Sequence, residues 1–456
     1  MSRNIVRKQI HLAAHFPGVN NTTVWADPAS KSQIDFESFV HLARTAERGK
    51  FDFFFLAEGL RLREHRGRIH DLDVVGRPDT LTVLEALAGA TTHLGLAGTI
   101  NTTFNEPYEL AKQFATLDHL SDGRAAWNLV TSSDAFTGEN FRRGGFLDHS
   151  QRYVRAAEVV DVVRQLWDGW SERGPVIDRE AGIFAADTDI APFDIHTTQF
   201  DIAGHFEVPR SPQGHPVFLQ AGDSDEGREF GAAKADAIFS RHGTLEEGQA
   251  FYTDVKSRLA KYGRSHDDLK ILPAAAFVLG DSAEDAEERA RHIRLQQVGP
   301  QTAIAFLEQV WGRDLSNYDP NGPLPDIDPE DNVTITRGRV RHAKDPRAVA
   351  EAWRAKAEAE NLSIRELIIE VTARQQFVGT AEQVAAEIDH YVQTDASDGF
   401  ILVPHLTPGG LDEFVDTVVP LLQERGSFRT EYDGTTLRSH LGLRHPHATN
   451  EGVRAS

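Results

Sequence analysis

The chain contains no cysteine, and this absence excludes several kinds of site at once. Without thiols there is no disulfide bond, no metal site held by thiolates and no cysteine nucleophile. Long apolar runs are missing as well, since no segment approaches the about 20 apolar residues that cross a bilayer. The first residues do not have the pattern of a secretory signal. We therefore expect a cytoplasmic protein without a membrane partner.

Positive charge is scarce relative to negative charge. The 456 residues include 48 Lys and Arg against 69 Asp and Glu, a formal net charge of −21. Such a chain repels the phosphates of nucleic acids, so we expect no nucleic-acid partner. The GxxxxGK[ST] and GxGxxG fingerprints are absent, and no His and carboxylate set has metal-ligand spacing on the predicted strand ends. We therefore expect neither a metal site nor a Rossmann nicotinamide site.

Short buried strands alternate with helical patterns along most of the chain. Hydrophobic residues make up 40% of the sequence, which is enough for a large core. Strands are predicted at residues 9–14, 51–57, 94–100, 125–130, 216–221, 235–240, 271–279 and 399–403. Strand and helix alternate eight times, which predicts an α/β fold, a (β/α)8 TIM barrel built by one domain over residues 1–456.

Three stretches depart from this alternation. Residues 169–214, after the fourth strand, have no long helical pattern and contain short predicted strands such as 205–208. Residues 312–347, in the region between the seventh and eighth strands, are rich in Pro, Asp and Gly and follow one long helical region over 281–311. Both stretches are predicted insertions. The tail, residues 425–456, is polar and is predicted to pack on the surface or on a neighbouring subunit.

The most informative stretch is residues 94–133, which reads as strand, helix and strand. Its first strand ends near Thr99 and Asn101, and its second contains Asn128 and ends near Ser132 and Ser133. Parallel barrels have their chemistry at the carboxyl ends of the strands, so we expect these side chains at the mouth of the barrel.

The segment NEPYELAKQFATLDHLSDGRAAWNLVTSS resembles the bacterial-luciferase-like flavin monooxygenases. Within them it is similar to the branch of nitrilotriacetate monooxygenase and dibenzothiophene-sulfone monooxygenase, and the resemblance extends over residues 9–443. It implies an FMNH2-dependent monooxygenase, the oxygenase component of a two-component system. A separate NAD(P)H:flavin reductase would supply the reduced FMN, and a homodimer or homotetramer is expected.

The chemistry implied by the resemblance depends on the cofactor. Reduced FMN would react with O2 to give a C4a-(hydro)peroxyflavin, and one oxygen atom would enter a small organic substrate. Cleavage of a C–N, C–S or C–halogen bond is among the expected outcomes. Two alternatives stay open: a deazaflavin-dependent oxidoreductase and a non-catalytic flavin-binding protein.

The triplet Gly222-Asp223-Ser224 joins a predicted strand to a helix. Backbone N–H groups at a helix start favour a phosphate, and Ser224 adds a hydroxyl. The triplet alone is more typical of an ordinary Ser or Asp helix cap. The segment QAGDS, however, matches the family segment that holds the FMN phosphate, so the resemblance implies that Ser224 binds the cofactor.

Further cofactor contacts follow from the resemblance. His149 and Tyr153 are spaced i, i+4 at the start of a helix, and in the family this pair contacts FMN. Thr99, Asn128 and Ser132 match positions near the flavin, and Asn101 and Thr103 are weaker candidates. Glu58 stands where the family usually has Asp, with the same charge on a side chain one methylene longer.

The catalytic residues stay unknown at this stage. His11 and His15 are candidates because they are predicted to end the first strand near the mouth. Ser133 is a third, although some relatives carry a histidine there. An aromatic lining that excludes water from the flavin is expected from Phe16, Trp25, Phe53, Phe55 and Trp127.

Overall fold

Eight parallel strands form a closed barrel in the computed structural model, which describes residues 7–20, 22–69, 75–131, 135–142, 147–330, 335–337, 345–373 and 375–448. The pairings of β14 with β1 and of β10 with β11 complete the ring. The strands are β1 (His11–His15), β2 (Phe53–Leu56), β5 (Gly95–Asn101), β6 (Ala125–Val130), β9 (Val217–Gln220), β10 (Ala237–Ser240), β11 (Lys270–Leu279) and β14 (Gly399–Leu402). The expected (β/α)8 TIM barrel is confirmed.

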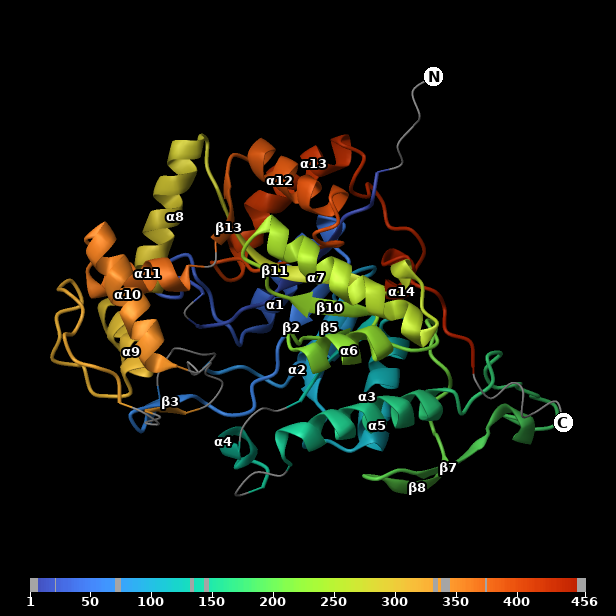
Figure 1. Cartoon of the computed structure of the whole chain (residues 1–456). Helices are drawn as coiled ribbons and strands as arrows, with labels where there is room; N and C mark the ends of the chain where they lie inside the picture. Colours follow the sequence, from blue (N-terminus) through green and yellow to red (C-terminus); the bar gives the residue numbers. More distant parts are fainter. Residues whose placement is uncertain are drawn as a thin grey trace.

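Helices cover the outside of the barrel (Figure 1). Short polar side chains begin several of them, since Asp79, Ser224, Thr244 and Ser282 each accept a hydrogen bond from a first-turn N–H. The helices of the outer layer are α1 (Phe36–Arg48), α2 (Thr80–Ala88), α3 (Pro107–Leu120), α5 (His149–Trp167), α6 (Asp225–Lys234), α7 (Leu245–Arg258), α8 (Ala283–Gln297), α12 (Ala381–Gln393) and α13 (Asp412–Glu424).

The barrel strands are buried on both faces, and their residues alternate between the two faces. Phe53 and Phe55 of β2 point into the barrel, whereas Phe54 packs outward into the core shared with the helices. The outer layer lies close to the sheet, because a Cβ added to Gly98 would lie 2.7 Å from Leu84 of α2. A glycine in β5 is therefore what allows α2 to pack at this distance.

Two regions add structure to the simple alternation. Between α5 and β9 lies the hairpin of β7 (Pro192–His196) and β8 (Asp201–His205), where the sequence predicted a strand over 205–208. Between β11 and β14 the chain adds α9 (Pro300–Trp311), α10 (Pro346–Glu360), α11 (Ile364–Thr372) and β13 (Gln375–Gly379). β13 is a ninth strand, parallel to the end of β11. Neither α11 nor β13 was predicted.

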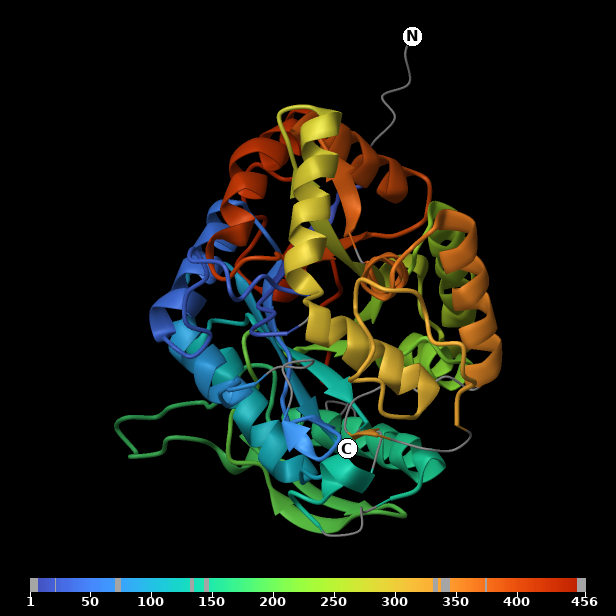
Figure 2. The ribbon, with the colours of Figure 1, turned by 90° about the vertical axis from the view of Figure 1, so that its left-hand side faces the viewer.

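The predicted long helical region over 281–311 is helical, but it is divided into two helices, α8 and α9. Gly299 precedes α9 in an extended conformation, and Pro300 is the first residue of that helix. Because proline lacks an N–H and clashes with the preceding turn, it starts α9 and cannot continue α8. The break lets α9, α10 and α11 form a separate apolar cluster around Trp311 and Leu315. Figures 1 and 2 show these helices grouped on one side of the barrel.

A small sheet joins this helical group to the loop after β2. It contains β12 (Thr336–Arg337), β3 (Glu64–His65) and β4 (Arg68–Ile69). His65 links the parts, with Nε2 2.5 Å from Glu308 Oε2 of α9 and Nδ1 2.7 Å from the Thr336 hydroxyl. Both partners are almost fully buried, so the loop and the helical group are connected by a buried polar contact.

The expectation that the tail packs on the surface is wrong. Its short helix α14 (Leu437–His440) lies at the amino end of the barrel, and Leu437, Leu441 and Leu443 pack against inward-facing strand residues. Leu437 and Leu441 have no exposed surface. The tail looks polar because its leucines are separated by charged residues. Two of these, Arg429 and Arg438, form ion pairs with the buried Asp52 and Asp236.

The remaining short elements are α4 (Ala135–Gly138), η1 (Asp187–Asp189), η2 (Leu259–Tyr262), η3 (His266–Asp268) and η4 (Gly409–Leu411). Within the part of the chain that the structure describes, no helix combines the length and apolarity needed to span a bilayer.

Candidate functional site

The carboxyl ends of the barrel strands bring together several residues singled out by the sequence. His15 and Phe55 are paired across β1 and β2, with their rings in an edge contact at 5.2 Å. Phe55 also stacks on Phe239 of β10, at a centroid distance of 5.6 Å. This end of the barrel therefore has an apolar wall with one imidazole beside it.

Thr99 and Asn128 lie opposite each other on β5 and β6. The Asn128 Nδ2 group donates a hydrogen bond to Thr99 Oγ1 at 2.8 Å. Both side chains are almost fully buried, and Asn128 Oδ1 has no hydrogen-bond partner among the described residues. Since an unpaired buried acceptor is costly, this oxygen is suited to accept a hydrogen bond from a ligand.

Glu58 follows β2 and is held by the end of β5. Its Oε2 accepts the backbone N–H of Asn101 at 3.0 Å, and its Oε1 accepts the Asn101 side-chain amide at 3.1 Å. The longer side chain found here in place of aspartate thus reaches the neighbouring strand. Asn101, a weaker candidate in the sequence, orients the carboxylate.

Ser224 caps α6, as the simpler interpretation of the sequence predicts. Its Oγ accepts the N–H of Gly227 at 3.1 Å. The turn is tight, because a Cβ on Gly227 would lie 3.1 Å from Gly222 Cα. Accepting this bond leaves the O–H of Ser224 able to donate, so capping and ligand binding are compatible.

Tyr153 lies near the start of α5 and faces α6. Its ring centroid is 6.3 Å from that of Phe230 in α6. The side chain is therefore beside the helix that Ser224 begins. α5 starts at His149, but the side chain of His149 lies outside the described residues, as do Ser132 and Ser133.

The expectation that His11 lies near the mouth is wrong. His11 begins β1 and is at the opposite, amino end of the barrel. Its Nδ1 is 3.1 Å from Asp52 Oδ1, and Arg429 of the tail donates to the same oxygen at 2.7 Å. Burial opposes ionisation of Asp52, but Arg429 and His11 outweigh it and lower its pKa to about 2. His11 belongs to a structural ion cluster.

The expected aromatic lining is only partly present. Phe53 and Phe55 do face the barrel interior. Phe16 stacks on Phe39 of α1 at 4.2 Å, and Trp127 stacks on Phe114 of α3 at 5.1 Å, so both point outward. Because residues alternate along a strand, the inward position of Asn128 requires its neighbour Trp127 to face the helices. The Trp25 side chain is half exposed.

Sequence reasoning missed His242, which lies two residues after the end of β10. Its Nε2 is buried and has no hydrogen-bond partner in the described part of the chain. Burial lowers its pKa, against the opposing effect of Asp223 and Glu247, which favours the neutral imidazole. The predicted strand over 235–240 was the available signal, since strand ends supply the residues of the mouth.

The described residues contain no group of three or more His, Cys, Asp or Glu side chains that could hold a metal ion. The polar groups described above at the mouth are hydroxyls, amides, the Glu58 carboxylate and imidazoles. Such a set can form hydrogen bonds with an organic ligand.

Comparisons with known proteins agree with this geometry. Residues 18–398 match the model of the luciferase-like monooxygenase family. The chain is 38% identical over 436 residues to nitrilotriacetate monooxygenase component A of Aminobacter aminovorans, covering 92% of this chain and 93% of that protein. It is 39% identical over 456 aligned residues to dibenzothiophene-sulfone monooxygenase of Rhodococcus erythropolis strain XP, covering 96% and 98%.

A solved structure supports the same assignment. The crystal structure of riboflavin lyase with modified FMN and its substrate riboflavin is similar with a TM-score of 0.78 and 27% identity, covering 98% of this chain and 99% of that one. The resemblance noted in the sequence is thus confirmed over nearly the whole length. The chain belongs to the luciferase-like monooxygenase family and is a flavin-dependent monooxygenase.

Proposed function

We propose that this protein is the oxygenase component of a two-component system, which uses reduced FMN and O2 to oxygenate a small organic substrate. The observation that carries the proposal is the start of α6 at the barrel mouth. There the Ser224 hydroxyl and the first-turn N–H groups lie on the helix that Tyr153 faces. A helix start of this kind suits the phosphate of a mononucleotide.

The residues of the mouth fit a flavin. Ser224 and Tyr153 would hold the phosphate, and Asn128 Oδ1, which no described residue pairs, is an acceptor suited to a ring N–H. Glu58 would contribute a carboxylate held in a fixed orientation by Asn101. Thr99 fixes the Asn128 amide, so the ring would meet preoriented partners. When bound, the reduced flavin supplies the activation of O2.

The apolar wall has a separate task. The ring of Phe55 lies beside His15 and stacks on Phe239, and the two phenylalanine rings would exclude water from the reacting flavin. His15 stays a candidate for contact with the substrate. The loop after Glu58, the hairpin of β7 and β8, and the small sheet near His65 would shape the substrate pocket.

The partner in this proposal is a separate NAD(P)H:flavin reductase that supplies reduced FMN. Support comes from relatives whose names give them as one part of a larger system, such as nitrilotriacetate monooxygenase component A. Another such relative, 38% identical over 449 residues, is one of the subunits of the pristinamycin IIA synthase of Streptomyces pristinaespiralis.

Cofactor choice is the first test. We expect the protein to bind FMNH2 more tightly than reduced FAD or a reduced deazaflavin, because a helix start offers one phosphate site. Anaerobic calorimetry with the three ligands measures this directly. Tighter binding of the deazaflavin would favour a deazaflavin-dependent oxidoreductase.

A screen of candidate substrates with FMN, NADH, O2 and an added reductase, in which the mass of each product is measured, separates an oxygenase from a non-catalytic flavin-binding protein.

We also propose that the protein is a homodimer or homotetramer in solution. Exposed apolar side chains on the outer surface, including Ile34 and Phe184, are consistent with contact between protomers. Light scattering at micromolar concentration is expected to show a multiple of the 50.5 kDa chain mass. A single species of monomer mass would contradict this expectation.

A further inference from the structure

The segment between α5 and β7 forms an arm, defined here as residues 171–190. Figure 2 shows the arm extending away from the body of the protein (green, at the left). Every residue from 176 to 184 is exposed. Four of them are large and apolar, and 46–66% of the surface of each is exposed. These four are Val176, Ile177, Ile183 and Phe184, and none belongs to a hydrophobic cluster of the described residues.

The arm is ordered by hydrogen bonds, although it has no core of its own. Asp178 and Ile183 exchange two backbone N–H···O=C bonds, both 2.8 Å long. At the base of the arm, the buried Asp189 carboxylate accepts the N–H of Val176 at 2.9 Å and that of Ala186 at 2.8 Å. The apolar side chains are therefore presented by a preformed backbone, which lowers the entropic cost of binding a partner.

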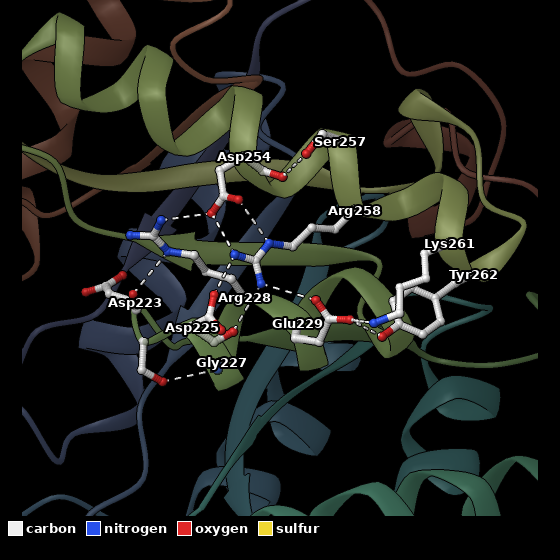
Figure 3. Close-up of polar contacts among 11 residues, drawn as sticks. Asp223, Asp225, Gly227, Arg228, Glu229, Asp254, Ser257, Arg258, Lys261 and Tyr262 are labelled. Carbon is white, nitrogen blue, oxygen red and sulfur yellow. Dashed lines mark hydrogen bonds and ion pairs between the residues drawn. The ribbon is translucent and has the colours of Figure 1, made fainter.

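A partly exposed ring elsewhere on the surface is attached to its own chain. The hydroxyl of Tyr262 donates to Glu229 Oε1 at 2.5 Å, and Lys261 Nζ lies 5.3 Å from the centre of the same ring (Figure 3). Single exposed apolar side chains are ordinary on a protein surface and need no explanation. Four large ones gathered within residues 176–184 indicate a contact surface.

The size of this apolar patch fits an interface between two copies of the chain. Four large side chains, each about half exposed, present on the order of 300–400 Å² per arm. In a two-fold assembly both arms are used, so the two patches and the surfaces that they cover reach on the order of 1,200–1,600 Å². A stable interface buries about 1,200–2,000 Å². Permanent interfaces are also more apolar than transient ones, and a reductase that only delivers flavin would leave the patch in water most of the time.

Two exposed arginines of the arm add charge complementarity. Arg173 and Arg179 have no ion pair or hydrogen bond among the residues that the structure describes. A second copy has a formal net charge of −21, so its surface offers carboxylates with which these guanidinium groups can pair. Arginine is also among the residues enriched at protein interfaces.

We propose that the arm is an oligomerisation element, whose four apolar side chains pack on a second copy of this chain while Arg173 and Arg179 pair with carboxylates of that copy. The proposal rests on the proposed homodimer or homotetramer and names the surface that forms it. In a closed two-fold assembly, each chain would receive the arm of the other.

Sedimentation equilibrium of the whole chain over a range of concentrations tests the proposal. Phe184→Ser is expected to weaken self-association at least about 30-fold, because buried aromatic residues are typical hot spots of interfaces. Ile177→Ser should weaken it about 10-fold, and Arg179→Ser about 3- to 10-fold with a weaker dependence on salt. A dimer should give monomers, and a tetramer should give dimers. Far-UV circular dichroism should not change, because the substituted side chains are exposed in the single chain.

Leu295→Ser is the matched control, because Leu295 is an exposed leucine of α8 and lies outside the arm. It should leave self-association unchanged. A second measurement uses the absence of cysteine, since Ala181→Cys gives a single site for an environment-sensitive dye in the turn of the arm. The emission of the dye should move to longer wavelength as dilution dissociates the oligomer. Emission that stays constant through dissociation would overturn the proposal.

The possible outcomes separate this inference from the oligomer on which it rests. Wild-type protein that is monomeric at micromolar concentration would refute both. An oligomer that stays intact in Phe184→Ser and Ile177→Ser would overturn this inference alone, as would an equal loss in Leu295→Ser. An added flavin reductase that binds wild type but not Phe184→Ser, while the oligomer is unchanged, would assign the arm to the reductase and contradict the proposal. If Phe184→Ser does not fold, Ile177→Ser and Arg179→Ser provide the test.

Discussion

Replacing Arg429 by methionine is expected to lower the free energy of unfolding by about 3–5 kcal/mol, because it leaves a buried carboxylate without its cation. That carboxylate belongs to Asp52, which has no exposed surface. Arg429 donates to Asp52 Oδ1 at 2.7 Å, and the backbone N–H of Leu12 donates to Oδ2 at 2.9 Å. The cluster joins the tail to the first two strands at the amino end of the barrel.

The effect should depend on pH in a defined direction. The pKa of Asp52 is lowered from 3.8 to about 2 in the folded protein. A carboxylate with a lowered folded pKa contributes stability above its unfolded pKa, here about 2 kcal/mol, and this contribution is lost as pH falls from about 4 to 2. Without Arg429 the burial remains, so the folded pKa rises. The deficit of Arg429→Met should therefore be largest at neutral pH and shrink toward pH 4.

The loss of unfolding free energy in Arg429→Met can be measured by urea unfolding at neutral pH and at pH 4, with tryptophan fluorescence as the signal. Arg444→Met is the matched control, because Arg444 lies in the same tail and pairs with Asp268 while its own side chain is 70% exposed. An exposed pair of this kind contributes about 0–1 kcal/mol. Equal losses for the two variants, or a deficit that grows as the pH is lowered, would refute the assignment of Arg429.

The second large effect concerns the phosphate contacts. Ser224→Ala and Tyr153→Phe should each weaken FMNH2 binding roughly 10- to 150-fold, because a hydrogen bond to a charged group contributes about 1.5–3 kcal/mol. The double variant should lose at least about 100-fold, since the two side chains would contact the phosphate from different helices. Turnover should recover at saturating flavin, because both residues act in binding. Anaerobic flavin titration of each variant measures the loss.

Loss of the helix cap has to be separated from loss of the ligand contact. Ser282→Ala provides this control, because Ser282 caps α8 through a hydrogen bond from Asp285 N at 3.2 Å, much as Ser224 caps α6. Both variants lose about 0.5–2 kcal/mol of cap stability. Only Ser224→Ala should lose FMNH2 affinity, and neither should change the binding of reduced riboflavin. Wild-type FMNH2 affinity in Ser224→Ala and Tyr153→Phe would mean that the phosphate binds elsewhere.

Glu58→Ala should behave differently from these variants. Its carboxylate is held by Asn101 at the mouth and would act near the flavin ring. More of the consumed O2 should therefore appear as hydrogen peroxide at every flavin concentration. Peroxide release that disappears at saturating FMNH2 would assign Glu58 to binding alone.

Part of the site could be predicted because it depends on local sequence. The strand over 125–130 was predicted with the bounds that β6 has, and Asn128 faces Thr99 as strand alternation requires. The triplet Gly222-Asp223-Ser224 by itself indicated an ordinary helix cap, and Ser224 is one. Its expected role at the FMN phosphate stays a prediction. These structural features follow from neighbours within a few residues, so a single sequence contains their signal.

Other features depend on contacts that the sequence cannot show. His11 was assigned to the wrong end of the barrel, since the predicted strand over 9–14 differed from His11–His15 by two residues at its start. Trp127 was expected inside because an apolar strand buried on both faces has no polar alternation to distinguish its sides. The gap between α8 and α9 shows the same limit, since the helical pattern continued past Pro300.

The sequence by itself determined the fold and the family of this protein. Local patterns contain the order of the eight strands and their helices, the small polar residues at the strand ends and the family's sequence motifs. The tertiary structure alone decided how the barrel is closed and charged. Arg429 meets Asp52 across 377 residues, and Arg258 meets Asp225 across 33. Such pairs leave no periodic trace, because only the folded barrel brings their charges within hydrogen-bond distance and removes the water that would screen them.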